Sequence, residues 1–496
     1  MSITVHELQL DQQPQPVLCC AHEFKDAGGN LRQCPHSNFL KGVQWSPDGA
    51  CLLTTSDDNL LRVYDLPAEV VEEPAKPGSA AATSADTLQS VLQVDEGETV
   101  YDYAWYPGML VSEPASCVFA CTARGHPIHL WDALSGELRA SYRVYNAADE
   151  VTAACSIAFD RQGQRLFAGL NNRLCIFDVA RPGRYCKNIV PHSRASPGLQ
   201  GIISCMACNP DRSAMLAAGS YLGDTGIFEE NSGDLLYVLQ GQRGGITQVE
   251  FSKDGNYLYT GARRDTDIFC WDIRYTSDVV NRLQRDSADT NQRIQFDIEP
   301  LGRHLATGGS KGRVQIFDLQ DGQEVGSYAA AADTVNGFQF HPFLPLAATA
   351  SGHRRLPAAL ASDSDSEEED SDSSPRDHSQ RSQRTRSMRT ADAAAQHCLE
   401  NALVVWQFQS IVRELMDAEA AELEAEHAKE PTEQEHHVQS DIAGASGSES
   451  VEADTEARRT ADEVTLAAVH DHEAGLEGAA QPPEQNASDS LEEVPL

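Results

Sequence analysis

The sequence predicts an all-β protein in which seven similar blades form a ring. The first observation is a repeating pattern of a short apolar strand, a tight turn and two more strands, the last of which ends in an aromatic residue followed by a polar one. The second is the spacing of these ends, whose four central intervals are 46, 51, 43 and 46 residues. The third is a distance of 18 or 19 residues from turn to aromatic residue. A period of about 40–45 residues is typical of WD40 blades, so we expect a seven-bladed WD40 β-propeller.

The first copy of the pattern shows each part. VQW (43–45) ends the first strand, SPDG (46–49) forms the turn, CLLTTS (51–56) is the second strand, and LLRVYD (60–65) is the third. The remaining copies end at Trp131, Phe177, Phe228, Trp271, Phe317 and Trp406. Since a single blade cannot bury its own apolar faces, we expect the whole ring to fold as one unit.

Two long intervals indicate insertions into a propeller that we place at residues 36–408. Residues 68–97 are rich in Ala, Ser, Pro and Glu, which predicts a loop insertion in blade one. Residues 353–397 carry an acidic run and then a basic one, which predicts a disordered insert in blade seven. Residues 1–35 form an N-terminal arm, and its apolar stretch at 14–24 is expected to supply the outer strand that closes the ring.

The C-terminal residues 409–496 differ in composition from the rest of the chain. They hold 4 Arg and Lys against 23 Asp and Glu, so −19 of the formal charge of −37 lies there. Apolar residues at helical spacings predict a short helix at 410–428, which either docks on the ring or waits for a partner. Beyond it, low hydrophobicity and high charge predict a largely disordered acidic tail.

The connectivity of a blade predicts one basic face on this acidic protein. Turns between strands two and three lie on one face, which we call the top, and turns between strands one and two lie on the bottom. The bottom turns contain Asp48, Asp160, Asp211, Asp254 and Glu299. The candidate RNA-binding residues at the top are Arg124, Arg173, Arg263, Arg264, Arg293, Lys311, Arg313, Arg354, Arg355, Phe39, Tyr101 and Tyr103. Arginines beside exposed aromatic rings suit single-stranded RNA, although Tyr101 and Tyr103 have an alternative place in the packing between blades.

The blade-seven insert also leaves from the top. Ser362, Ser364 and Ser366 each have an acid three residues later, which suits an acid-directed kinase. We expect phosphorylation there to add negative charge and to weaken RNA binding by competition, whereas the alternative is a spacer loop with incidental serines.

No pattern in the sequence predicts catalysis, a cofactor or a metal. GGSKGR (308–313) lacks the spacing of a phosphate-binding loop, and no nucleophile–base arrangement is present. Cys205 and Cys208 are spaced like metal ligands, but on a strand their thiols would point to opposite faces, which favours core packing. Neither a signal peptide nor a membrane-spanning run is expected, and a net negative charge argues against promiscuous binding to DNA or to anionic membranes.

Several long segments resemble the telomerase Cajal body protein family of WD-repeat proteins. The most specific are HLWDALSGELRASYR (129–143) and ARPGR (180–184), and others include EGETVYDYAWY (96–106) and VNGFQFHPFLPLAATASG (335–352). The resemblance covers residues 36–355 approximately. It implies a scaffold without enzymatic activity that binds the CAB-box loop of small Cajal body RNAs and of telomerase RNA.

The resemblance also implies partners and a location. The partners are telomerase and box H/ACA ribonucleoprotein components and Cajal body scaffold proteins. The location is the nucleus, in Cajal bodies, with the cytoplasm as a second place. The roles implied are delivery of the particles to Cajal bodies, telomerase assembly and telomere maintenance. A different class of function stays open, namely a protein-interaction propeller that acts as an assembly platform or substrate receptor without RNA.

Overall fold

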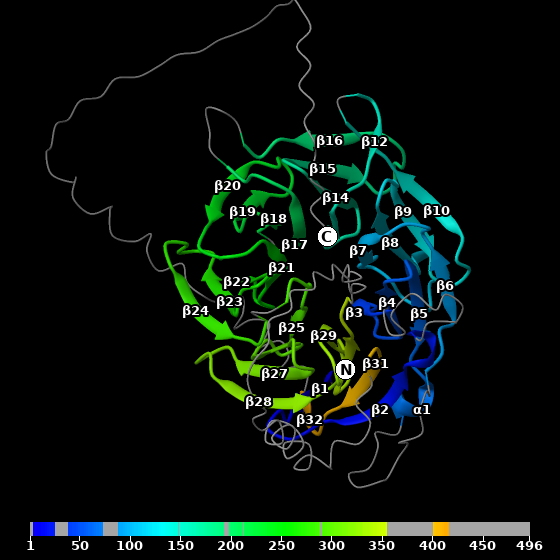
Figure 1. The fold of residues 1–496 in the computed structure, drawn as a ribbon, viewed down its shortest axis with the longest axis vertical. Coiled ribbons are helices and arrows are strands. Elements are labelled where there is room, and N and C mark those ends of the chain that lie inside the picture. Colours follow the sequence, from blue (N-terminus) through cyan, green and yellow to red (C-terminus); the bar gives the residue numbers. More distant parts are fainter. Residues whose placement is uncertain are drawn as a thin grey trace, which may run out of the picture. The chain divides into compact units, whose positions relative to one another are not determined.

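A computed structural model describes residues 3–24, 38–72, 88–146, 148–192, 198–211, 213–287, 290–354 and 400–415 of the chain. They all belong to one compact unit, Met1–Glu430, and the second unit, Pro431–Leu496, contains no described residue. In this part of the chain, seven antiparallel four-stranded sheets follow one another around a ring (Figure 1). The predicted seven-bladed β-propeller is confirmed.

The first four blades are each formed by four consecutive strands. Blade one contains β3 (Leu40–Trp45), β4 (Cys51–Ser56), β5 (Leu60–Asp65) and β6 (Leu92–Asp95). Blade two contains β7 (Val100–Trp105), β8 (Val118–Ala123), β9 (Ile128–Asp132) and β10 (Leu138–Tyr142). Blade three contains β13 (Ser156–Phe159), β14 (Arg165–Leu170), β15 (Arg173–Asp178) and β16 (Cys186–Ile189). Blade four contains β17 (Ile203–Cys208), β18 (Met215–Ser220), β19 (Thr225–Glu229) and β20 (Leu235–Leu239).

The remaining blades complete the ring. Blade five contains β21 (Ile246–Phe251), β22 (Tyr257–Ala262), β23 (Asp267–Asp272) and β24 (Val279–Gln284). Blade six contains β25 (Phe296–Ile298), β26 (His304–Thr307), β27 (Arg313–Asp318) and β28 (Glu324–Ala329). Blade seven contains β29 (Val335–Phe340), β30 (Leu346–Ser351), β31 (Leu403–Gln407) and β2 (Gln15–Cys20). The smaller elements are the hairpin β11 (Val144–Tyr145) and β12 (Val151–Thr152), the helix α1 (Ala68–Glu72) and the 3-10 turns η1 (His22–Phe24) and η2 (Pro114–Ser116).

The core lies between neighbouring blades, because the second and third strands of the blades are largely buried on both faces. In β4 every residue is buried, and in β14 every residue after Arg165 is buried. Trp271 Nε1 of β23 donates to Thr260 Oγ1 at 3.1 Å, and Trp406 Nε1 of β31 donates to Thr349 Oγ1 at 2.8 Å. These bonds satisfy indole donors that burial would otherwise leave unpaired.

An N-terminal strand closes the ring by joining a C-terminal blade. β2 pairs antiparallel with β31, with Cys20 opposite Leu403. The outer strand of blade seven thus comes from the start of the chain, within the stretch 14–24. β2 covers the edge of β31, so blade seven has four strands like the other blades. Pairing within the chain at this edge limits unwanted pairing with other chains.

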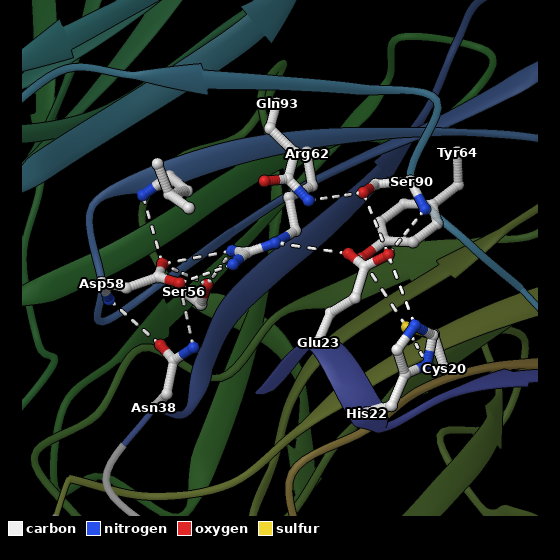
Figure 2. A network of polar contacts seen from close by, with 11 residues as sticks. Cys20, His22, Glu23, Asn38, Ser56, Asp58, Arg62, Tyr64, Ser90 and Gln93 are labelled. Carbon is white, nitrogen blue, oxygen red and sulfur yellow. Dashed lines mark hydrogen bonds and ion pairs between the residues drawn. The ribbon is translucent and has the colours of Figure 1, made fainter. Parts of the chain in front are cut away.

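A polar network fixes the end of this strand to blade one (Figure 2). Glu23 accepts from Tyr64 Oη at 2.8 Å and from the Ser90 amide at 2.8 Å, and its carboxylate lies 3.4 Å from Arg62 Nε. Arg62 also donates to Asp58 Oδ2 at 2.6 Å. Because Arg62 is buried, the two carboxylates are what make its charge tolerable in the interior.

Two expectations for the segments outside the repeats are wrong in part. The predicted loop at 68–97 contains α1 at its start and β6 near its end, and β6 is the outer strand of blade one, paired with β5. The predicted helix at 410–428 begins instead with β32 (Ser410–Leu415), which pairs antiparallel with β1 (Ile3–Leu8). Pairing with a distant segment overrides the helical spacing of Ile411 and Val412, and a single-segment pattern cannot reveal such a partner. Residues 416–428 lie outside the described part.

The acids of the bottom turns serve the turns themselves. Asp48 Oδ1 accepts from Ser46 Oγ at 2.6 Å and from the Ala50 amide at 3.1 Å, while Gly49 takes the left-handed backbone (φ +74°) that this turn requires. Asp160 accepts from the Gln164 amide at 2.7 Å and pairs with Arg165. Much of the negative charge of the ring is thereby committed to local structure away from the top.

Candidate nucleic-acid interface

The central feature of the top is an arginine that reaches across the ring. Arg293 lies in the connection that enters blade six, yet it donates through Nη1 to the Tyr101 carbonyl of blade two at 3.2 Å. Through Nη2 it donates to the Ser204 carbonyl at 3.1 Å and to Tyr221 Oη at 3.0 Å, both in blade four. A side chain that binds blades two and four from blade six lies at the axis of the ring.

The two carbonyls are free to accept because the inner strands slip in register at their upper ends. In β7 the pairing with β8 shifts between Val100 and Asp102, so Tyr101 lies outside the ladder. In β17 the pairing with β18 shifts between Ile203 and Cys205, which leaves Ser204 outside it. A bulge leaves backbone groups unpaired by its own sheet, and Arg293 satisfies one from each strand.

A second arginine shares the same phenol oxygen. Arg263, directly after β22, donates through Nη2 to Tyr221 Oη at 2.7 Å, and its guanidinium carbon lies 4.4 Å from the centre of the Tyr221 ring. Burial and the neighbouring Arg293 lower the pKa of Arg263. Burial also acts to lower the pKa of Arg293, but Tyr221 and Asp102 outweigh that effect, so the pKa of Arg293 is raised. The Nε of Arg263 is buried and has no hydrogen-bond partner within the described residues.

Asp102 of β7 is the carboxylate whose charge acts on Arg293. It accepts from the Ile157 amide of blade three at 2.9 Å and from its own neighbour, the Tyr103 amide, at 3.1 Å. Burial raises the pKa of Asp102 to about 6, against the opposing effect of Arg293. The axis cluster, which we define as Tyr101, Asp102, Tyr221, Arg263 and Arg293, therefore carries two positive charges and at most one negative charge. Such an excess of positive charge attracts an anion.

Five of the predicted basic residues lie exposed around this cluster, at the turns between second and third strands. Arg124 is close enough to Tyr101 to oppose the rise that burial causes in the pKa of that phenol. Arg264 adopts a positive φ of 52° in its turn. Lys311 pairs with Asp286 at 2.9 Å, and Arg313 donates to Ser327 Oγ at 2.7 Å. The exposed set is Arg124, Arg264, Lys311, Arg313 and Arg354.

The other predicted residues differ in burial. Arg173 is half-buried and donates to the Tyr145 carbonyl at 2.8 Å. Tyr101 is half-buried at the axis. Phe39 and Tyr103 are each 7% exposed, so their prediction as rings that stack on bases is wrong. Tyr103 is an inward-pointing residue of β7 and packs in the core between blades one and two, as the alternative interpretation proposed. Arg355, the insert from 355 to 397 and its serines Ser362, Ser364 and Ser366 lie outside the described residues.

Two members of the axis cluster were not predicted from the sequence. Tyr221 occupies the turn between β18 and β19, and Asp102 interrupts the aromatic pattern YDYAWY of β7. An acid in an inner strand is a usable signal, because a buried carboxylate needs a partner. The partner itself cannot be found in the local sequence, because Arg293 reaches this strand only when the ring closes. Arg293 is 192 residues from Tyr101, whose carbonyl it contacts.

A group of potential metal ligands lies elsewhere, at the seam between the N-terminal arm and blade one (Figure 2). Cys20, His22 and Glu23 bring ligand atoms together, but the Glu23 oxygens already accept from Tyr64 and Ser90 beside the Arg62 guanidinium. A cation would have to compete with that guanidinium, so the seam is a structural network. Cys205 and Cys208 pack into different inter-blade clusters, in agreement with the predicted opposite faces.

Among the described residues, the helices are all too short or too polar to cross a bilayer.

Comparison with known proteins shows which proteins the chain is similar to. The family model "WD domain, G-beta repeat" matches residues 29–65 and 233–272. Telomerase Cajal body protein 1 of Homo sapiens is 42% identical over 337 residues, which are 67% of this chain and 60% of that protein. Its Drosophila melanogaster homologue is 37% identical over 322 residues, which are 64% of this chain and 57% of that protein. The matched part thus spans about three fifths of these relatives.

A fission-yeast relative is covered more fully. The "guanine nucleotide-binding protein negative regulator 1" of Schizosaccharomyces pombe is 32% identical over 317 residues, which are 62% of this chain and 77% of that protein. These matches confirm the resemblance found in the sequence. The chain therefore belongs to the WD-repeat family that includes the telomerase Cajal body proteins.

Proposed function

We propose that the chain is an RNA-binding scaffold that recognises the CAB-box loop of small Cajal body RNAs and of telomerase RNA with its top face. The observation that carries the proposal is the positive axis cluster, in which Arg263 and Arg293 share Tyr221 Oη, ringed by exposed arginines on a strongly acidic chain. Membership of the telomerase Cajal body protein family supports it.

The chemistry of the face suits a loop rather than a duplex. Phosphates need cations that keep their charge, and Arg124 and Arg264 are exposed guanidiniums. Unpaired bases need donors and acceptors in a recess, and the axis cluster offers guanidinium and phenol groups beside Asp102. Since the bottom turns are acidic, an RNA would be held by the top face and repelled by the bottom.

In this proposal the chain delivers the bound particles to Cajal bodies within the nucleus and supports telomerase assembly and telomere maintenance. Its partners would be small Cajal body RNA, telomerase RNA, telomerase and box H/ACA ribonucleoprotein components, and Cajal body scaffold proteins. The propeller fold and the names of the relatives suggest a protein without enzymatic activity.

Titration of the purified full chain into a labelled small Cajal body RNA tests the proposal. We expect tight binding that weakens steeply with salt, and weaker binding to an RNA of equal length whose CAB-box loop is replaced. Arg264→Gln should weaken binding. Arg274→Gln should not, because Arg274 follows the end of the third strand of blade five and pairs with Asp272. Equal affinity for the two RNAs would overturn CAB-box recognition.

A second candidate is a protein-interaction propeller. The match to a fission-yeast protein named as a negative regulator of a guanine nucleotide-binding protein favours it, since more than three quarters of that relative is covered. This function predicts binding that does not respond to removal of RNA and that depends weakly on salt. Treatment of a cell extract with ribonuclease before affinity purification of the chain separates the two candidates.

A further inference from the structure

The outer edge of blade three interrupts the acidic character of the chain. Residues 179–210 contain no Asp or Glu at all, although these residues make up 75 of the 496 in the sequence. The same stretch holds Arg181, Arg184 and Lys187 in the connection to β16 and within it, all exposed. A long acid-free run with exposed cations is a local reversal of charge, which would attract a polyanion to this edge.

Aromatic rings alternate with these cations. The guanidinium of Arg184 lies 4.4 Å from the centre of the Tyr145 ring, and that of Arg181 lies 5.2 Å from the centre of the Tyr185 ring. Tyr185 is 68% exposed, so its ring is accessible to a ligand. We call Tyr145, Arg181, Arg184, Tyr185 and Lys187 the edge patch.

Most of the positive charge of the edge patch is not neutralised by acids. Lys187 Nζ donates to two backbone carbonyls, Asn231 at 3.1 Å and Ser232 at 2.7 Å. Arg184 pairs with Asp149 at 2.8 Å, but both side chains are more than half exposed, so a stronger anion can displace the pair. Arg181 has no ion pair within the described residues. A ligand phosphate could therefore contact these cations at little cost.

The edge patch is hollowed. A depression of about 460 Å³ is lined by Ile176, Asp178, Arg181, Arg184, Tyr185, Cys186 and Lys187. It offers the ring of Tyr185 for stacking, guanidiniums for phosphates and the Asp178 carboxylate for a base amino group. An acidic peptide would use the cations alone and would leave the exposed ring without a role.

The edge patch is continuous with the top face through Tyr145. The carbonyl of Tyr145 accepts from Arg173, which is the first residue of β15, and the ring of Tyr145 carries Arg184 of the edge patch. A strand that leaves the top beside Arg173 would therefore meet Tyr145 and Arg184 on its way to the outer edge.

We propose that the edge patch is a second RNA site, which binds a single-stranded segment flanking the loop held at the top. The proposal rests on the proposed function for the kind of ligand, single-stranded RNA, but places it on different residues. Bases stack on Tyr185 and Tyr145 while their phosphates pair with Arg181, Arg184 and Lys187. A duplex is excluded because its bases are stacked on one another and cannot reach the two rings.

The test uses the full chain and a fluorescein-labelled adenylate RNA of about 15 nucleotides, which is within the range of site sizes known for single-strand binding. Wild type should bind this strand more tightly than a duplex of the same length. Arg181→Gln with Arg184→Gln should weaken binding and reduce the slope of log affinity against log salt by about 1.4, since each phosphate contact on a single strand contributes about 0.7. Tyr185→Ala should lower the affinity at least about fivefold, and Tyr185→Phe should retain it because the ring remains.

The matched control is Arg274→Gln with Arg303→Gln. Arg274 also lies over a tyrosine ring, Tyr257 at 5.9 Å, and Arg303 is similarly exposed, but they belong to blades five and six. This double variant should bind the adenylate strand like wild type. Melting temperatures by circular dichroism should be unchanged in the edge-patch double variant, because both of its side chains are at the surface. The control double variant should melt slightly lower, because Asp272 and Asp318 each lose an arginine partner.

The outcomes separate the two proposals. If the edge-patch variants bind the adenylate strand with wild-type affinity and slope, the second site is overturned, even where Arg264→Gln still weakens binding of the small Cajal body RNA. If wild type binds neither RNA, both proposals fail. If a labelled oligoglutamate peptide binds and only the edge-patch variants lose it, the site belongs to an acidic protein partner and the RNA assignment is wrong.

Discussion

Arg293 donates to Tyr221 Oη at 3.0 Å although the two residues enter the ring in blades six and four. The bond is one of three that Arg293 makes across the axis, and each ends on a different strand or turn. A side chain with this reach ties blades together at the top, where the RNA is proposed to bind. It therefore has a structural role and an electrostatic one, and the two can be separated by substitution.

Arg293→Met should destabilise the ring. Methionine keeps most of the volume but leaves the Tyr101 and Ser204 carbonyls without their donor, and Tyr221 Oη retains only the bond from Arg263. Hydrogen bonds from a charged group contribute about 1.5–3 kcal/mol each, and partial replacement by water at the axis reduces the total, so we expect a loss of about 2–3 kcal/mol. Urea unfolding measures it. Arg264→Met, at an exposed turn, should stay within about 0.5 kcal/mol of wild type, and an equal loss in both variants would contradict the bridging role.

Arg263 and Arg264 should separate stability from RNA binding, although they are adjacent. Arg264→Glu reverses an exposed charge, so small Cajal body RNA should bind more weakly while the melting temperature stays nearly unchanged. Arg263→Glu should weaken binding and also lower the melting temperature, because a glutamate cannot donate to Tyr221 or lie over its ring. Fluorescence anisotropy and thermal unfolding on both variants check this. A normal melting temperature for Arg263→Glu would show that the contact with Tyr221 is dispensable.

Asp102 should make RNA binding pH-dependent. Its pKa is raised to about 6, so it is charged at pH 7.5 and mostly neutral at pH 5.5. Protonation removes the negative charge that opposes Arg293, and RNA should bind more tightly at the lower pH. For an RNA phosphate about 6 Å from the Asp102 carboxylate in water-like surroundings, the repulsion that protonation removes is about 0.7 kcal/mol, or roughly threefold in affinity.

The variant Asp102→Asn supplies the comparison. It is neutral at both pH values, so its affinity at pH 7.5 should resemble that of wild type at pH 5.5. Subtracting the pH dependence of the variant's affinity from that of wild type cancels any contribution from titration of the RNA itself. The same pH dependence in the variant and in wild type would rule Asp102 out as its source.

The sequence predicts the ring well because the ring is repetitive. Blade period, turn residues and strand apolarity are local signals, and they recur often enough to place blades such as β3–β6 and β21–β24. The basic turns follow from connectivity alone. The axis cluster cannot be predicted in this way, because Arg293 and Asp102 come together only when the ring closes. Neither local sequence indicates the other residue as a partner. Phe39 and Tyr103 show the converse error, because an aromatic residue near a rim looks the same in sequence whether it points outward or into the core.

Buried His341 should make the ring sensitive to acid. Its Nε2 lies 3.0 Å from the Gly49 carbonyl, and its Nδ1 accepts from the amides of Phe343 and Leu344 at 3.0 and 2.9 Å. A proton on Nδ1 would face two other donors. Burial lowers the pKa of His341 to about 4, below the ordinary value of 6.5.

The unfolded chain therefore binds the proton first as the pH falls. Stability contributed by neutral His341 is fully present above pH 6.5 and is lost progressively as the pH falls from 6.5 to 4, by about 3 kcal/mol in total. His341→Gln can still donate to Gly49, and it should be less stable at pH 7.5 but show a flatter decline in urea unfolding between these pH values. An identical decline in both proteins would assign the acid sensitivity to other groups.

Crosslinking of the full chain to RNA in cells, followed by sequencing of the bound RNA, tests the central claim most directly. The account predicts enrichment of small Cajal body RNAs, with crosslinks concentrated in the CAB-box loop and reduced by Arg264→Glu but not by Arg274→Gln. Recovery of no small nuclear RNA above background would contradict it and would leave the protein-interaction propeller as the function of this ring.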